Sequence, residues 1–243
     1  MKILGIGLLL VLALSSTCGA VSVSYDVYPG FNCIAAPLVP INPDPIVPLT
    51  IGSTTYPGVF AQAIDGIDGL LVRNDPATGG IPWDGLEDPP GLSFGKVLLG
   101  DGYWLTVYSD GSKVQYEGLA DGVPDAGGAM TDMWISLPGA GGGIGGWHLI
   151  GQPFNHDTPV DDGSGTGVFI TFTNGSVTMD WSDAVAAGWV SPVMTGNDPA
   201  TGGVPVQYDG LGSDDHLRAG KGYWVQTFID NLAMIIPAYT SVP

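Results

Sequence analysis

The chain has few basic residues, few histidines and few cysteines, and each shortage excludes a class of function. Its 243 residues include 6 lysines and arginines against 24 aspartates and glutamates, so the formal net charge is −18 at pH 7. Such a charge repels nucleic acid and anionic membrane surfaces, and we expect neither as a partner. The same charge would keep a crowded extracellular assembly soluble and could attract divalent cations.

Recognisable catalytic motifs are also missing. With three histidines, His148, His156 and His216, and no G-x-S-x-G motif, the sequence offers no nucleophile and base at a known spacing. The histidines and cysteines do not follow zinc-ligand spacing. Eight of the 22 aspartates stand in Asp-Gly pairs, which favour turn geometry rather than paired-carboxylate catalysis. We expect no enzymatic activity, no catalytic residue, no metal ligand and no cofactor, and we interpret His148 as a polar surface residue.

Residues 1–20 have the pattern of a secretory signal peptide. Lys2 precedes an apolar run at residues 3–14, and Ala20 ends a small-residue cleavage sequence. That run is too short to span a bilayer, and no later segment is apolar enough. We expect cleavage after Ala20 and a secreted, extracellular or cell-surface protein; a lipoprotein anchored through Cys18 is the alternative. Cys33 then stands alone, so no intrachain disulfide is expected.

An internal repeat is the strongest signal in the sequence. The matched segments, in order, are residues 31–38 with 147–154, 74–82 with 197–205, and 99–104 with 219–224. The middle pair reads NDPATGGIP and NDPATGGVP, and the last pair shares the letters GYW. Cys33 falls on Leu149, which predicts a buried packing role for the cysteine. Three matches in the same order indicate a duplicated unit.

The repeat predicts a mainly β fold with two tandem immunoglobulin-like or small-barrel domains, each with one short helix. We place the β domains at residues 21–130 and 131–243, called here the first copy and the second copy, with the glycine-rich residues 139–146 as a linker. Turn signals predict hairpins at residues 167–179, around Asn174-Gly175, and at residues 103–116 and 224–236. The predicted helices are residues 60–64 and residues 183–187, the latter capped by Ser182.

A strand with strict alternation follows the expected cleavage site. Its apolar face carries Val21, Val23, Tyr25 and Val27, and serines and Asp26 alternate with them. Cleavage would make this strand the new N-terminus. It could complete the sheet of its own domain, or it could complete the sheet of a neighbouring subunit by strand addition. Alternation alone does not decide between these two.

Two kinds of ligand have candidate residues. Clustered aspartates could hold calcium, although none follows a fixed ligand spacing; these are Asp161 with Asp162, Asp65 with Asp68, and Asp209 with Asp214 and Asp215. Exposed tryptophans could stack on glycans, and the candidates are Trp83, Trp181 and Trp189. Trp104 and Trp224 are expected in the core because both belong to the repeated GYW motif.

The motif W-x-L-I-G-x-P at Trp147–Pro153, with GYW-V at Gly222–Val225, resembles uncharacterised secreted bacterial tandem β-domain proteins. The pattern is also similar to subunits of extracellular fibrils whose domains are completed by an N-terminal strand from another subunit. The resemblance implies a homopolymer in which Val21, Val23, Tyr25 and Val27 form the assembly strand. The expected function is therefore a structural subunit of an extracellular fibre or surface assembly. A secreted carbohydrate-binding or adhesin module is the alternative.

Overall fold

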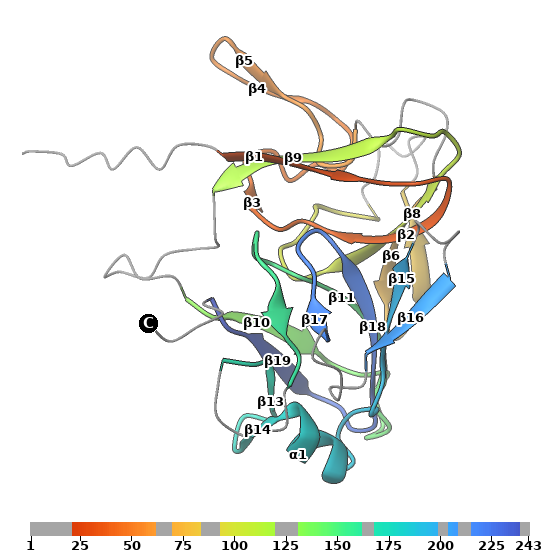
Figure 1. Ribbon diagram of the computed structural model, residues 1–243, viewed down its shortest axis with the longest axis vertical. Helices are drawn as coiled ribbons and strands as arrows, with labels where there is room; N and C mark the ends of the chain where they lie inside the picture. Colours follow the sequence, from red (N-terminus) through yellow and green to blue (C-terminus); the bar gives the residue numbers. More distant parts are fainter. Residues whose placement is uncertain are drawn as a thin grey trace, which may run out of the picture.

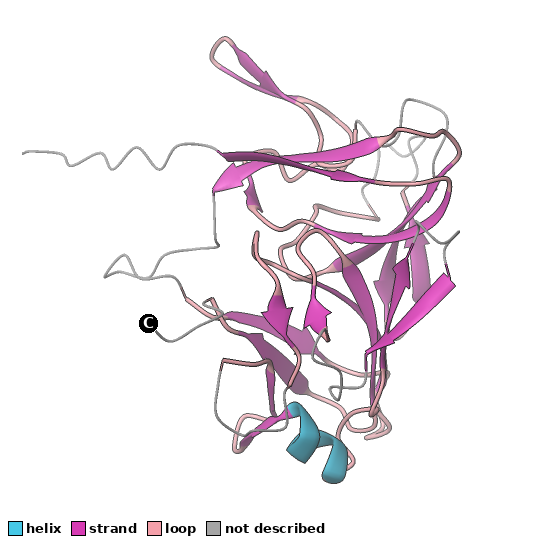
Figure 2. Cartoon of the chain, viewed as in Figure 1, coloured by secondary structure: helices cyan, strands magenta, loops and turns pink. Residues whose placement is uncertain are grey.

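The protein is mainly β, with several antiparallel sheets, as the sequence predicted (Figures 1 and 2). A computed structural model describes residues 21–61, 70–83, 93–119, 131–161, 168–198, 204–208 and 215–238. The expected signal peptide lies outside the described residues. No described helix is long and apolar enough to cross a membrane.

The first copy contains two larger sheets and a separate hairpin. One sheet has the order β1-β9-β3 and comprises β1 (Val21–Asp26), β9 (Lys113–Leu119) and β3 (Val39–Pro40). The other has the order β2-β8-β6-β7 and comprises β2 (Gly30–Ala35), β8 (Gly102–Val107), β6 (Leu71–Asp75) and β7 (Gly79–Pro82). The hairpin of β4 (Leu49–Ile51) and β5 (Thr54–Tyr56) projects at the top of Figure 1.

The second copy repeats this arrangement. One sheet has the order β10-β19-β13-β14 and comprises β10 (Met133–Leu137), β19 (Leu232–Ile236), β13 (Thr171–Thr173) and β14 (Thr178–Asp180). The other has the order β11-β18-β15-β16 and comprises β11 (Gly146–Gly151), β18 (Gly222–Thr227), β15 (Met194–Asp198) and β16 (Val204–Tyr208). A short pair joins β12 (Thr158–Pro159) to β17 (His216–Leu217). The strands that carry the repeated motifs therefore occupy equivalent places in the sheets β2-β8-β6-β7 and β11-β18-β15-β16.

Each copy has its own hydrophobic core, built from side chains on both of its larger sheets. In the first copy, Tyr103 and Leu105 of β8 cluster with Val114 and Tyr116 of β9. In the second, residues of β18 and β19 cluster with Phe172 and Trp181. Burial of these apolar side chains is the main driving force for folding.

Two of the expected hairpins are wrong in their pairing. β8 and β9 follow each other in sequence but belong to different sheets, and so do β18 and β19. β8 pairs with β2 and β6, whereas β9 pairs with β1 and β3. The turn around Asp110-Gly111 therefore carries the chain from one sheet to the other. A turn signal reports a change of direction, and long-range pairing decides which strands become neighbours.

The expected hairpin at Asn174-Gly175 is present, with a different turn. Thr173 pairs with Thr178, which leaves a four-residue loop. Only Gly175 has a positive φ, of 86°. The Oδ1 atom of Asn174 instead accepts hydrogen bonds from the backbone nitrogens of Ser176 and Val177, both at 3.0 Å. The asparagine side chain thus closes the turn as an Asx motif.

One short helix, α1 (Trp181–Ala186), lies where the second helix was predicted, but its cap differs. Asp180, not Ser182, is the N-cap residue, and its side chain accepts from the backbone nitrogen of Asp183 at 2.8 Å. Phe60 and Ala61 lie in a turn, and the rest of the other predicted helix, residues 62–64, is outside the described residues.

Residues 139–146 do not link the two copies. They connect β10 to β11, and both strands pair within the second copy. The carboxylate of Asp230 accepts hydrogen bonds from the backbone nitrogens of Gly143 and Gly145, and these bonds hold the loop against the turn that follows β18. Residues 141–146 read G-x-G-x-x-G, but a strand and not a helix follows them, so they lack the helix N-terminus of a dinucleotide-binding motif. The connection between the copies runs through residues 120–130, which are outside the described residues.

Candidate functional site

β1, the expected assembly strand, lies at the edge of the described three-stranded sheet. It pairs antiparallel with β9 of its own chain, from Val21 opposite Gly118 to Asp26 opposite Lys113. The expected alternation is confirmed, because Val21, Val23 and Tyr25 are half-buried and the residues between them are exposed. Val27 continues the apolar face and is buried. An exposed ion pair between Asp26 and Lys113, at 2.9 Å, adds little stability.

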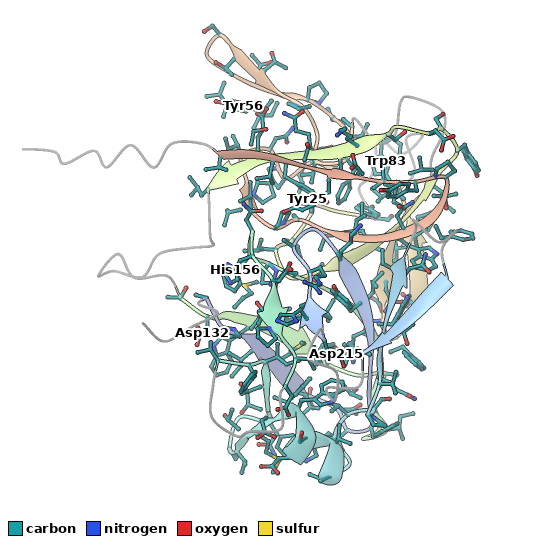
Figure 3. The ribbon with its side chains drawn as sticks, viewed as in Figure 1. Tyr25, Tyr56, Trp83, Asp132, His156 and Asp215 are labelled. Carbon is teal, nitrogen blue, oxygen red and sulfur yellow. The ribbon has the colours of Figure 1, made fainter. Side chains whose placement is uncertain are left out.

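Tyr25 reaches from β1 to the second copy (Figure 3). Its hydroxyl donates a hydrogen bond of 2.6 Å to Oδ1 of Asn155. Its ring lies so close to Gly220 that a Cβ atom on the glycine would be 2.8 Å from Cδ2 of the tyrosine. Burial, and then the charge of Asp157, raises the pKa of Tyr25 to about 12, so the phenol keeps the proton that it donates.

β10 makes the corresponding contact in the opposite direction. Ile135 faces Met234 of β19 as Tyr25 faces Val114 of β9. A Cβ atom on Gly100 would lie 2.9 Å from Cγ1 of Ile135, and Gly100 matches Gly220 in the repeat. Both glycines also have a positive φ, of 87° and 75°. The first strand of each copy therefore rests on a glycine of the other copy, where a side chain would be both strained and obstructed.

Hydrogen bonds between the copies are reciprocal. Nδ2 of Asn74 donates to the carbonyl oxygen of Trp147 at 3.0 Å, and Nδ2 of Asn197 donates to the carbonyl oxygen of Phe31. These asparagines open the repeated NDPATGG segments. The backbone repeats the pattern, because the nitrogen of Ala35 donates to Gly220 and that of Gly151 donates to Gly100. Sequence reasoning missed this role, although the identity of the two segments was its signal.

Small residues allow close contact between the backbones of the two copies where β2 and β8 of the first copy meet β11 of the second. We call this contact the crossing. A Cβ atom on Gly102 would lie 2.5 Å from the carbonyl oxygen of Ile150, and one on Gly151 would meet the methyl group of Ala35. Cys33 and Leu149 are also buried, but among the described residues they belong to neither core cluster. The predicted burial of Cys33 is confirmed, and burial raises the pKa of its thiol above the ordinary value.

Aromatic side chains form a row across the boundary between the copies. Phe31 stacks on Trp104 with ring centroids 5.5 Å apart, Trp104 meets Trp224 at 6.4 Å, and Trp224 meets Trp147 at 6.4 Å. We call these four residues the aromatic row. The expectation that Trp104 and Trp224 lie in a core is wrong, because both are half-buried. The ends of the row are more open, with 51 % of Phe31 and 49 % of Trp147 exposed.

The three tryptophans expected on an exposed glycan platform are not exposed. Trp181 is buried in the core of the second copy, and Trp189 packs against the same core. Trp83, labelled in Figure 3, packs against the core of the first copy. The exposed tryptophans of the described residues are instead Trp134 and Trp147. Side chains alternate between the two faces of a strand, and Trp147 lies on the face directed away from the core of its copy. The match between the two copies did not show which face it would occupy.

A cavity of about 220 Å³ lies beside the crossing of the two copies. Asn74 and Asp101 of the first copy and His148 of the second contribute polar groups, and apolar residues such as Ile135 and Leu149 line the rest. Burial raises the pKa of Asp101 to about 6, opposed by Arg73. Burial lowers the pKa of His148 to about 4. At neutral pH the cavity thus presents a carboxylate and a neutral imidazole.

His148 is not the surface residue that the sequence suggested. It is 4 % exposed, and its Nε2 atom lies 3.3 Å from Oγ1 of Thr227. Its counterpart Asn32 is also buried, and its Nδ2 atom donates to the carbonyl oxygens of Tyr28 and Gly30. Both side chains point inward from the first strand of a four-stranded sheet. Hydrogen-bond partners within the same chain make this burial of polar groups tolerable.

The proposed calcium clusters are only partly visible. Asp161 is buried, and its carboxylate accepts hydrogen bonds from the backbone nitrogen and the hydroxyl of Ser182 at 3.0 and 2.6 Å. It therefore supports the start of α1. Asp215 is described, whereas the other aspartates of those clusters are outside the described residues. Across the described part of the chain, no three acidic, histidine or cysteine side chains gather in a way that could hold a metal ion.

Comparison with known proteins found no matching family model, no matching curated protein and no matching solved structure.

Proposed function

We propose that the protein is a non-catalytic structural subunit of an extracellular fibre or surface assembly, joined to its neighbours by addition of β1. The observation that supports this most is the position of β1. It is an edge strand near the start of the chain, and its one described strand neighbour is β9. An edge strand with one apolar face can be supplied equally well by another chain.

Exchange between identical chains conserves the contacts of β1. In a neighbouring subunit, Val21, Val23 and Tyr25 would meet the same residues that they meet in their own chain. Intrachain and interchain pairing therefore differ mainly in the entropy of joining two molecules, which protein concentration offsets. Because the accepting and the donating surfaces differ, the contact is heterologous, and repeated addition extends into a polymer when the rotation between subunits does not close a ring.

A disulfide between β1 and β9 tests this proposal. Ser24 and Gln115 face each other, and the carbonyl of Glu117, two residues further on, bonds to Ile41 on the opposite edge of β9. Ser24 and Gln115 thus form a non-hydrogen-bonded pair, the closer kind, which suits a disulfide. We expect the oxidised Ser24→Cys/Gln115→Cys chain to stay monomeric and to form filaments after reduction, as seen by electron microscopy and light scattering.

The matched control locks β10 instead. Ser136→Cys/Ala233→Cys joins the equivalent strands of the second copy at two residues that lie opposite each other. Because β10 lies in the middle of the chain, this disulfide should leave assembly unchanged. Filaments from the oxidised β1 variant, or none from the unmodified secreted protein at any concentration, would contradict the proposal.

A second function, a secreted carbohydrate-binding or adhesin module, is favoured by the aromatic row. Exposed aromatic faces bind the apolar faces of sugar rings, and the row exposes about half of Phe31 and of Trp147. Titration with neutral oligosaccharides should quench tryptophan fluorescence, and Trp147→Ala should remove the response. Trp134→Ala is the control, because Trp134 is 60 % exposed but lies on β10, away from the row. Equal responses from both variants would reject this function.

A further inference from the structure

We infer that Tyr25 fixes the register of β1, and that the site accepting β1 is built from both copies of the accepting chain. The partner is a second copy of this protein, and in that respect the inference rests on the proposed strand addition.

The apolar face of β1 does not define a register by itself. The apolar face repeats at two-residue steps, and three of its four residues, Val21, Val23 and Val27, are valines. A slip of two residues keeps each side chain on its face and places one valine where another had been. Backbone pairing to β9 also repeats with a period of two. Tyr25 is the one apolar-face residue that differs in size and carries a hydrogen-bond donor.

The surroundings of Tyr25 fit a tyrosine and not a valine. Its ring covers Gly220, its hydroxyl reaches Asn155 at 2.6 Å, and its edge meets the ring of Tyr116 with centroids 6.0 Å apart. A valine brought to this position by a slip would leave the surface of Gly220 uncovered and Asn155 without this donor. The displaced tyrosine would lose the same contacts, so the slipped registers are disfavoured on both counts.

Two different copies supply the parts of this site. β9 and Tyr116 belong to the first copy, whereas Gly220 and Asn155 belong to the second. Asp157 holds the second-copy part together, because its carboxylate accepts from the backbone nitrogen of Ala219 at 2.9 Å and from Nη1 of Arg218 at 2.6 Å. The loop that carries Asn155 and the turn that carries Gly220 are therefore fixed to each other. A chain accepts β1 in the correct register only when its two copies are docked.

The register matters most between chains. In its own chain, β1 is joined to β2 through residues 27–29, and this short connection also restricts sliding. A strand inserted in a neighbour has no such connection to the β9 strand that it joins. The contacts of Tyr25 with the second copy of the accepting chain then select the register.

Interchain disulfide mapping tests the inference. A donor with Ser24→Cys is mixed with acceptors that carry Lys113→Cys, Gln115→Cys or Glu117→Cys, and the disulfides formed during assembly are quantified by mass spectrometry. These three β9 positions differ by two residues and read three registers. We expect the 24–115 disulfide to exceed each of the other two by about tenfold or more, as loss of one buried ring contact and one hydrogen bond predicts.

Conservative variants then separate the parts of the site. Tyr25→Phe in the donor and Asn155→Ala in the acceptor each remove the same hydrogen bond, and each should lower the selectivity about fivefold, with no further loss when combined. Tyr25→Val should spread the disulfides over all three positions. Asn174→Ala in the acceptor is the control, because it removes hydrogen bonds within a turn of the second copy, to Ser176 and Val177, and none to β1 or between the copies; it should leave the selectivity unchanged.

The outcomes distinguish this inference from the proposed function. Interchain disulfides in equal amounts at all three positions, or selectivity that survives Tyr25→Val, would overturn the role of Tyr25 while strand addition stands. Selectivity unaffected by Asn155→Ala would remove the second copy from the site. A complete absence of interchain disulfides, with each variant folded and its introduced thiol reactive, would overturn strand addition itself.

Discussion

The two copies each place their first strand across the other copy, but the two strands are held in different ways. β10 is connected on both sides, and the loop that follows it is fixed to Asp230. It presents the aliphatic Ile135 to Gly100. β1 presents Tyr25 to Gly220 and adds a hydrogen bond to Asn155. A strand held permanently by its connections requires no specific side-chain signal, whereas a strand that is exchanged between chains, as we propose for β1, does.

The sheets that receive these strands differ too. In the second copy, β19 pairs with β10 on one side and with β13 at Ala233–Ile235 on the other. In the first copy, β9 pairs with β1 along its length, but β3 contributes only Val39 and Pro40. The hairpin β4–β5 forms a sheet of its own instead (Figure 1). β1 is therefore a larger part of its sheet than β10 is, and its removal would expose more.

The largest expected effect concerns the crossing that both strands depend on. Gly151→Ala should destabilise the fold by about 3 kcal/mol, because the new methyl group meets Ala35 and lies 2.5 Å from the carbonyl oxygen of Asp101. Urea unfolding measures this loss. The double variant Ala35→Gly/Gly151→Ala should recover part of it, since the first of these two obstructions disappears. An unchanged midpoint for Gly151→Ala would show that the copies do not need this close approach.

The second-largest expected effect concerns charge at the same crossing. The two copies differ there, because Asp101 of the first copy corresponds to Lys221 of the second. Burial raises the pKa of Asp101 from 3.8 to about 6, so protonated Asp101 stabilises the fold below pH 4 and this stability is lost as the pH rises through 6. Asp101→Asn should therefore match the wild type at pH 4 and exceed it by about 2 kcal/mol at pH 7.5, allowing for partial solvent screening.

Urea unfolding across this pH range measures the difference, with His148→Asn as a variant of opposite sign. Burial lowers the pKa of His148 to about 4, so the stability that neutral His148 contributes above pH 6.5 is lost as the pH falls toward 4. Replacement by asparagine, the residue at the matched position 32, should flatten that loss. Parallel pH curves for Asp101→Asn and the wild type would show that the Asp101 carboxylate is better solvated than its burial implies.

The reciprocal asparagines should have similar, smaller effects. Asn74→Ala and Asn197→Ala each remove one hydrogen bond between the copies and should each cost about 1 kcal/mol. Because they bond to different acceptors, the two losses should add in the double variant. Denaturant unfolding checks both values. A large difference between the two single variants would show that the two hydrogen bonds contribute unequally to stability, although they are equivalent in geometry.

Sequence patterns predicted the parts of the fold that depend on local chemistry. Alternation identified β1 and its apolar face, Asn174-Gly175 identified a hairpin, and the repeat identified equivalent strands. The failures arose where distant segments compete. Nothing local to Asp110-Gly111 shows that β9 pairs with β1 rather than with β8, and Trp104 and His148 were assigned the wrong environments because the packing of the two copies was not visible. The partners of Tyr25, 130 and 195 residues away in sequence, were beyond any local pattern.

An effect of the same small size isolates the difference between β1 and β10. Tyr25→Phe should cost about 1 kcal/mol, because it removes the hydrogen bond to Asn155 and keeps the ring over Gly220. Asn155→Ala should cost a similar amount, and the double variant should cost little more than either, since both remove one interaction. A double-mutant cycle by urea unfolding, with the monomer kept dilute, measures the coupling. Strictly additive losses would mean that Asn155 and the hydroxyl of Tyr25 are not energetically coupled. β1 would then be held, like β10, by side-chain packing alone.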